Sequence, residues 1–207
     1  MAPLWVVAIS AVVYACAAFL AAQWSEAICR NVTPFEDGPR SGTPPTLLLI
    51  AAAGILGGVV ASRGLGLEMT LFFGMLAAAL VGAWCSDVRC GLVPDVFTLV
   101  PLAIIVVASA IGHQFAPAIA AAVIFVPFGA AAFLSKGRGM GWGDVKLCAL
   151  GASLLSLETA IIAYAGACLA AVMIAAARNR RSDPIAFAPY LASAVAIAVV
   201  LVVRPGL

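Results

Sequence analysis

Residues 4–22 read LWVVAISAVVYACAAFLAA, an apolar run without one charged side chain. An α-helix of this length comes close to the ~30 Å thickness of the hydrocarbon core of a bilayer. Further blocks of alanine, leucine, valine and isoleucine follow along the chain. None has the strict apolar/polar alternation that a membrane β-barrel requires. The sequence therefore predicts a protein whose membrane spans are helices.

Composition leads to the same class. Of 207 residues, 65% are hydrophobic and only 10% are charged, and the mean hydropathy is +1.16. These values exclude an ordinary soluble domain. The net charge of +2 is too small for a nucleic-acid-binding surface and is ordinary for a membrane protein. We predict an all-α, polytopic membrane protein, with residues 1–207 as a single integral membrane domain that contacts lipid and binds no nucleic acid.

Eight apolar segments are candidate transmembrane helices, and the sixth is short. It could fuse with the seventh, although Ser153, Ser156 and Glu158 mark a plausible turn between them, so seven and eight spans both remain open. The predicted segments are Leu4–Ala22, Thr46–Ser62, Leu67–Trp84, Val93–Ile111, Pro117–Leu134, Asp144–Leu155, Glu158–Ala177 and Ile185–Val203.

The distribution of Lys and Arg favours eight spans, because these residues concentrate in cytoplasmic loops. If residues 23–45 form a cytoplasmic loop, eight spans leave only Arg63 and Arg204 outside, and both termini lie outside. Seven spans would put the cluster at residues 178–181 on the wrong face. No Lys or Arg precedes Leu4, so the first segment is expected to be a retained span rather than a signal peptide. The predicted cytoplasmic residues are Arg30, Arg40, Arg89, Lys136, Arg138, Lys146, Arg178, Arg180 and Arg181.

Two aspartates occur where apolar runs meet polar segments on this predicted cytoplasmic face. Asp87 follows Cys85 and Ser86, and Asp144 lies in the sequence GWGDVKL. Ionisable groups near hydrocarbon are costly, which makes both acids candidate functional residues. A pair of carboxylates that shares a proton can hydrolyse a peptide bond, one accepting a proton from water and the other donating to the carbonyl oxygen.

Other readings of the two acids stay open. Asp144 could be the N-cap of a helix, and Asp87 could be a loop acid paired with Arg89. The pair could also be the relay of a proton-coupled transporter or channel. Alternating glycines before Asp144 permit a sharp bend and close backbone approach. They do not form a phosphate-binding loop, because no strand precedes them and the Gly-Lys-Ser/Thr ending is absent. These glycines are Gly137, Gly139, Gly141 and Gly143.

The cysteines show no CxxC spacing, which indicates neither a zinc site nor a disulfide framework. We interpret most of them as small packing residues, including Cys85 and Cys90 on either side of Asp87. His113, the single histidine, lies in a predicted outer loop, which argues against a histidine-based triad and most transition-metal sites. No metal and no cofactor are predicted. The cysteines are Cys16, Cys29, Cys85, Cys90, Cys148 and Cys168.

The sequence GWGDVKL resembles the GxGD signature of the type IV prepilin peptidases, and DVRCGLVPD at residues 87–95 is similar to their upstream aspartate segment. A third segment, residues 185–192, resembles their Pro-Phe-Gly-Pro-Phe-Leu-Ala. The resemblance implies that Asp87 and Asp144, in motifs at residues 85–95 and 137–147, are the catalytic aspartates of an intramembrane aspartic protease. Asp95 is not implied, and we interpret it as a carboxylate at a helix N-terminus and Lys146 as a cytoplasmic anchor.

The resemblance also implies a substrate and a location. Such enzymes remove the short basic leader of type IV prepilins, or of the pseudopilins of type II secretion, at the cytoplasmic boundary of the inner membrane. Acidic residues on the same side could attract this leader; they are Glu26, Glu36, Asp37 and Asp183.

Many members of the family also carry a long cytoplasmic domain with zinc-binding CxxC pairs, and methylate the new N-terminus with S-adenosylmethionine. Residues 23–45 are too short for that domain and hold one cysteine, Cys29. We therefore expect a compact form. A bifunctional peptidase and N-methyltransferase stays an alternative.

Overall fold

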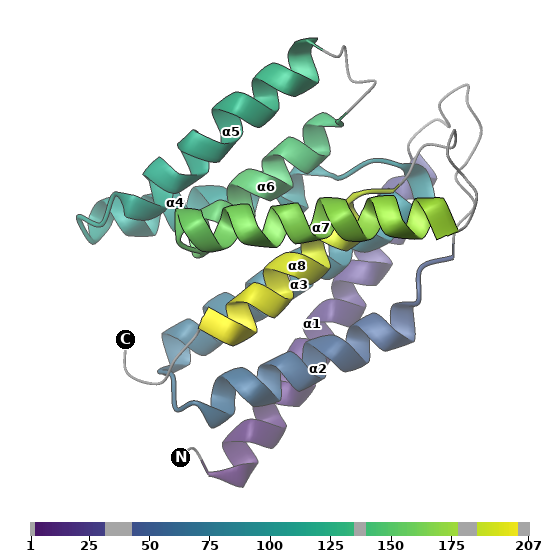
Figure 1. Ribbon diagram of the computed structural model, residues 1–207. Helices are drawn as coiled ribbons and strands as arrows, with labels where there is room; N and C mark the ends of the chain where they lie inside the picture. Colours follow the sequence, from purple (N-terminus) through teal and green to yellow (C-terminus); the bar gives the residue numbers. More distant parts are fainter. Residues whose placement is uncertain (1–2, 32–42, 135–139, 178–185, 203–207) are drawn as a thin grey trace. The chain divides into compact units, whose positions relative to one another are not determined.

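The computed structural model describes residues 3–31, 43–134, 140–177 and 186–202, and this part of the chain contains helices and no strand (Figure 1). The predicted all-α fold is thus confirmed. Helices α6 and α7 are separate, which agrees with eight segments rather than seven. The Ser156 Oγ accepts a hydrogen bond from the Thr159 N–H and caps the start of α7. The elements are α1 (Leu4–Asn31), α2 (Thr46–Ser62), α3 (Leu67–Cys90), the 3₁₀ turn η1 (Asp95–Phe97), α4 (Leu99–Ile111), α5 (Ala116–Leu134), α6 (Trp142–Leu154), α7 (Leu157–Ala177) and α8 (Ala188–Val202).

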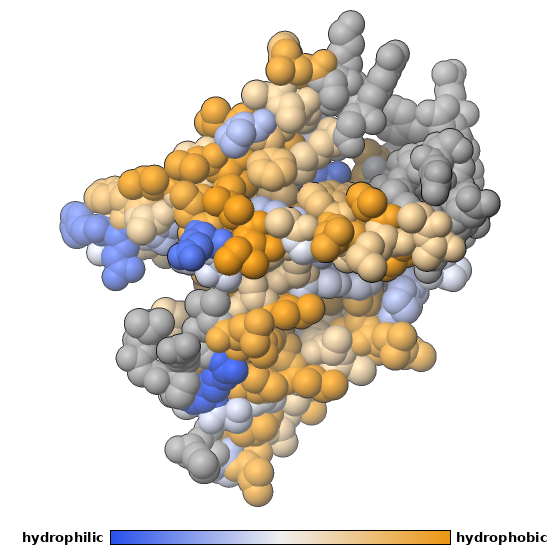
Figure 2. Space-filling model, in the orientation of Figure 1, coloured by the Kyte–Doolittle hydropathy of each residue, from blue (hydrophilic) through white to orange (hydrophobic). Residues whose placement is uncertain are grey.

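Within the described ranges, four helices are long and apolar enough to cross a membrane by themselves, namely α1, α3, α5 and α7. Helices α2 and α8, and η1 together with α4, are apolar but shorter. Large apolar side chains are exposed along these helices, among them Leu20, Leu48, Phe133 and Val172, and apolar surface dominates the view in Figure 2. Surface of this kind is unfavourable in water and suits contact with lipid.

The chain divides into two compact units. The first unit comprises Met1–Leu92 and Val200–Leu207, and the second comprises Val93–Val199. These units are defined by helix packing alone, and the single integral membrane domain stays a prediction.

In the first unit, α1, α2 and α3 pack through small residues and one tyrosine. Tyr14 of α1 is buried, and its hydroxyl donates a hydrogen bond to the carbonyl oxygen of Thr70 on α3 at 2.5 Å. A Cβ atom at Gly57 of α2 would lie 2.6 Å from the Tyr14 Cγ and 2.7 Å from the carbonyl oxygen of Ser10. Membrane helices approach closely where residues are small. The position of Tyr14 between α2 and α3 therefore depends on Gly57 lacking a side chain.

Helices α1 and α3 extend well beyond their predicted ends. Helix α1 continues to Asn31 instead of ending at Ala22, so the first part of the predicted loop at residues 23–45 is helical. This extension contains no Gly or Pro, and Glu26 and Arg30 form an i,i+4 ion pair along it. Helix α3 continues past Trp84 to Cys90 and ends where Gly91 adopts φ +66°, the left-handed conformation common after helices.

In the second unit, α6 is the most deeply buried helix. Its residues Val145, Leu147 and Leu150 have no exposed surface. A Cβ atom at Gly151 would lie 2.5 Å from the Tyr164 hydroxyl on α7 and 2.6 Å from the Val195 Cγ2 on α8. The Tyr164 hydroxyl donates to the carbonyl oxygen of Cys148. Gly151 thus lets α7 and α8 pack closely against the short α6.

The predicted fourth segment, Val93–Ile111, is interrupted. The turn η1 follows Pro94, and α4 begins only at Leu99, after Thr98 with φ −123° and ψ −58°. Pro101 has no N–H to donate to the Phe97 carbonyl, so a continuous helix from Asp95 would lack a hydrogen bond there. In the observed arrangement Pro101 occupies the first turn of α4, where no such bond is needed.

Gly57 and its neighbour Gly58 provide a matched test of the first unit. We expect Gly57→Ala to destabilise the protein by about 1–3 kcal/mol, because the new methyl group meets Tyr14 and backbone. Gly58→Ala should be neutral or stabilising, because its methyl group would meet only Val7 and Ala11 at 3.6 Å and 3.9 Å. Thermal unfolding of the purified variants in detergent measures both effects, and equal melting temperatures would contradict this account of the helix packing.

Candidate active site

Asp87 lies in the last turn of α3 and is only 5% exposed. Its carbonyl oxygen accepts a hydrogen bond of 2.9 Å from the Gly91 N–H, which closes the helix. Ser86 and Cys85 beside it are fully buried. The position is therefore helical, not the loop position considered from the sequence. A buried carboxyl at the end of a long apolar helix is costly, and this makes it a strong functional candidate.

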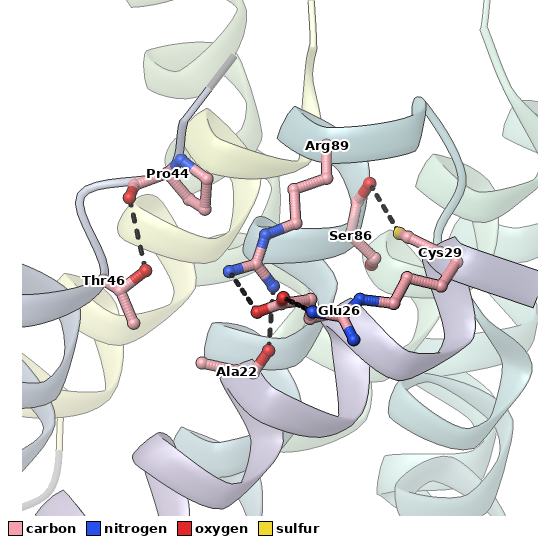
Figure 3. Close-up of polar contacts among 8 residues, drawn as sticks. Ala22, Glu26, Cys29, Pro44, Thr46, Ser86 and Arg89 are labelled. Carbon is pink, nitrogen blue, oxygen red and sulfur yellow. Dashed lines mark hydrogen bonds and ion pairs between the residues drawn. The ribbon is translucent and has the colours of Figure 1, made fainter. Parts of the chain in front are cut away.

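Arg89, two residues further along α3, reaches across to α1 (Figure 3). Its Nη1 donates to the carbonyl oxygen of Ala22 at 2.9 Å, and its Nη2 lies 3.6 Å from the Glu26 Oε2. Because Glu26 also pairs with Arg30 at 2.5 Å, its charge is already neutralised by two cations. Glu26 is thus a poor candidate for attracting a basic leader, whereas Glu36, Asp37 and Asp183 lie outside the described residues.

Asp144 lies in the first turn of α6 and is partly exposed. Its N–H donates to the carbonyl oxygen of Gly141 at 3.1 Å, and Gly141 is the N-cap of the helix. The interpretation of Asp144 as N-cap is therefore wrong, because α6 begins two residues earlier at Trp142. At this position the helix dipole favours a negative charge.

The two described glycines of the GxGD segment have different steric surroundings. A Cβ atom at Gly143 would lie 2.7 Å from the Cβ of Val93, and one at Gly141 would lie 3.4 Å from the Asp144 Oδ2. Val93 belongs to the DVRCGLVPD segment, so the two sequence motifs are in contact here within the second unit. Gly137 and Gly139 lie outside the described residues.

A second contact joins the same two motifs. The Lys146 Nζ lies 2.5 Å from the Asp95 Oδ1. Asp95 is in η1 and its side chain is 60% exposed, while that of Lys146 is 24% exposed. Lys146, interpreted from the sequence as an anchor, thus binds the start of η1 to α6. Ion pairs this exposed contribute roughly 0–1 kcal/mol, so their main effect here is on position.

Cys29 and Cys90 form a disulfide between α1 and the last turn of α3, with the Cα atoms 5.9 Å apart. The prediction that the cysteines form no disulfide is wrong for this pair. The sequence does not indicate this pair, because the partners are 61 residues apart and residues 23–45 are expected to form a loop. Cys85 and Cys148 are free and fully buried, as packing residues would be. Among the described residues, no three His, Cys, Asp or Glu side chains are grouped so that they could hold a metal.

Comparison with known families adds to this geometry. A model of the type IV leader peptidase family matches residues 72–176, half of the chain. The chain belongs to this family. The matched segment begins in α3, ends in α7, and contains Asp87, Val93, Gly143 and Asp144. No curated protein matches the chain, and no solved structure matches it.

Family membership supports a peptidase acting in a membrane rather than a proton-coupled transporter. Asp87 belongs to the first unit and Asp144 to the second. Both acids and their motifs were predicted from the sequence, and their catalytic role stays a prediction. The sequence did not indicate the contacts of Val93 with Gly143 and of Asp95 with Lys146, because these partners are about fifty residues apart.

Gly143 can be tested against a glycine with free space. We expect Gly143→Ala to lower peptidase activity at least about tenfold. A conflict at 2.7 Å must move Val93 or the first turn of α6, which carries the candidate residue Asp144, and small displacements of a reacting group are costly. Gly166→Ala on α7 is the control, since no atom lies within 4 Å of its new Cβ. Cleavage of a leader-containing precursor, normalised to folded enzyme, is the measurement. Full activity of Gly143→Ala would show that the contact is not needed.

Proposed function

We propose that this leader peptidase is an aspartic endopeptidase and that Asp87 and Asp144 carry its reaction. The observation that carries the proposal is the burial of Asp87 at the end of a long apolar helix, inside the segment matched by a peptidase family. The position of Asp144 in the first turn of α6 also supports the proposal. There, Gly143 leaves no room for a side chain beside Val93, and Gly141 leaves little room beside the Asp144 carboxylate.

In the proposed reaction the two carboxyl groups share one proton. The ionised group accepts a proton from water as the water oxygen attacks the carbonyl carbon, and the protonated group donates to the carbonyl oxygen. Protonation of the amide nitrogen then breaks the C–N bond, giving a carboxylate and a free amine. Two carboxylates held close together do not both ionise, so acid and base belong to the pair rather than to one residue.

The proposed substrates are precursors of type IV pilins or of pseudopilins, cleaved between a short basic leader and a hydrophobic helix. Support comes from the three sequence segments that resemble the prepilin peptidases. Asp87 and Asp144 both lie at helix ends, as a site at a membrane boundary requires. We place this site at the cytoplasmic face of the inner membrane, on the basis of the positive residues predicted for that side.

The dyad is tested with three matched Asp→Asn variants. Asp87→Asn and Asp144→Asn should each reduce cleavage at least about 100-fold, because an amide neither accepts nor donates the shared proton. Asp95→Asn, which loses only an exposed ion pair, should cleave at close to the wild-type rate. The readout is mass spectrometry of a co-expressed pilin-like precursor, with membrane insertion of each variant checked. Substantial cleavage by either of the first two variants would remove that residue from the dyad.

The same spectra decide whether the enzyme also methylates. For this compact chain we expect a mature N-terminus without an added methyl group, because residues 23–45 cannot hold the zinc-binding domain found in many methylating members. A mature product carrying one methyl group, formed only with the wild-type enzyme, would instead establish the bifunctional alternative.

A further inference from the structure

An open, surface-exposed cavity of about 550 Å³ lies within the first unit, between the C-terminal end of α1, the N-terminal end of α2 and the last turn of α3. Figure 3 shows most of the residues around it. Neither Asp87 nor Asp144 lines it, so it is distinct from the proposed catalytic residues. Its lining residues are Glu26, Cys29, Arg30, Thr43, Pro44, Thr46 and Arg89.

The charges of the described lining residues do not cancel. Among them, Arg30 and Arg89 contribute two positive charges and Glu26 one negative charge, which leaves these three side chains with a net charge of +1. Both carboxylate oxygens of Glu26 already face a guanidinium group, at 2.5 Å and 3.6 Å. Each guanidinium carries several N–H donors, and the contacts of Arg89 with Ala22 and Glu26 engage only some of them. The cavity is therefore suited to a singly charged anion.

The donors present favour phosphate. The planar fork of an arginine matches two oxygens of a phosphate group. The hydroxyl of Thr43 adds a short polar side chain, whereas the hydroxyl of Thr46 already donates to the carbonyl oxygen of Pro44. Helix α2 begins at Thr46 with no acidic residue in its first turn and no side-chain cap at Pro45, so its positive end adds to the attraction of an anion. A phosphodiester carries one negative charge, which balances the net charge of the described lining side chains.

Exposed apolar residues are close in sequence to the lining residues of this cavity on both α1 and α2. Leu47 and Leu48 directly follow Thr46 on α2 and are strongly exposed, and Leu20 is exposed on α1 less than two turns before Glu26. A ligand with a charged head and apolar chains would use both surfaces, whereas a soluble phosphate would use only the first. We propose that this cavity binds the headgroup phosphate of an anionic phospholipid.

The test is native mass spectrometry of the purified full-length protein titrated with phosphatidylglycerol or phosphatidylcholine. Phosphatidylglycerol should bind more tightly than phosphatidylcholine, because the choline group carries a positive charge that the arginines of the cavity repel. Arg30→Gln should weaken phosphatidylglycerol binding about fivefold, the effect of one basic residue near an anionic lipid. Arg63→Gln, which removes the same charge from the opposite end of α2, should leave it unchanged. Glu26→Gln should bind at least as tightly as wild type, because it removes a competitor for the guanidinium groups.

Several outcomes would overturn the proposal. They are wild-type binding by Arg30→Gln, an equal loss in Arg63→Gln, and weaker binding by Glu26→Gln in a protein with unchanged thermal unfolding. Displacement of the lipid by millimolar sn-glycerol 3-phosphate would show that the site takes soluble phosphate esters, and would overturn the assignment to lipid. Because the side chain of Arg30 is largely exposed, this variant is expected to fold, and binding is measured without any substrate.

Discussion

The contact between Gly143 and Val93 is the constraint on which the arrangement of the second unit's motif residues depends. With 2.7 Å between the Val93 Cβ and the place where a Gly143 Cβ would be, the backbone of α6 lies directly on the chain that leaves α3. Asp144 follows Gly143 immediately, and Asp95 follows Val93 by two residues and pairs with Lys146. The backbone that carries Asp144 is thus held mainly by the close approach of Gly143 to Val93, and the exposed Asp95–Lys146 pair adds little to it. Any side chain at Gly143 would separate the two motifs.

Much of the fold could be predicted because hydrocarbon imposes a simple rule on sequence. Runs such as residues 46–62 and 117–134 have no charge, and the observed helices α2 and α5 coincide with them within one residue. The rule fails where a helix leaves the apolar region and continues through polar residues. Hydropathy ends the first segment at Ala22, yet backbone hydrogen bonding and the Glu26–Arg30 pair continue α1 to Asn31. The same error hid the disulfide, since Cys29 faces Cys90 only if that stretch is helical.

In the candidate site, too, some features could be predicted from the sequence and others could not. Asp87 and Asp144 could be found from the sequence because acids are rare and costly beside apolar runs. The contacts around them could not, since Asp95 and Lys146 are 51 residues apart and nothing in their spacing indicates a pair. Gly143 could be recognised as permitting close approach, but only the structure identifies Val93 as the group that approaches. The candidate residues could thus be predicted from the sequence, whereas the residues that contact their motifs are determined by tertiary packing.

Helix α1 lies outside the segment that matches the leader peptidase family, yet it holds the helix that carries Asp87. Three links connect its C-terminal end to the last turns of α3, namely the Cys29–Cys90 disulfide, the hydrogen bond from Arg89 to the Ala22 carbonyl, and the Arg89–Glu26 pair. Asp87 lies between Ser86 and Arg89 in this turn, so its backbone is fixed by contacts that the matched segment alone would not provide. If the phosphate of a lipid also binds Arg89, the surrounding membrane becomes part of the support of this turn. The proposed catalytic residue Asp87 is therefore held in place partly by a helix from outside the matched segment.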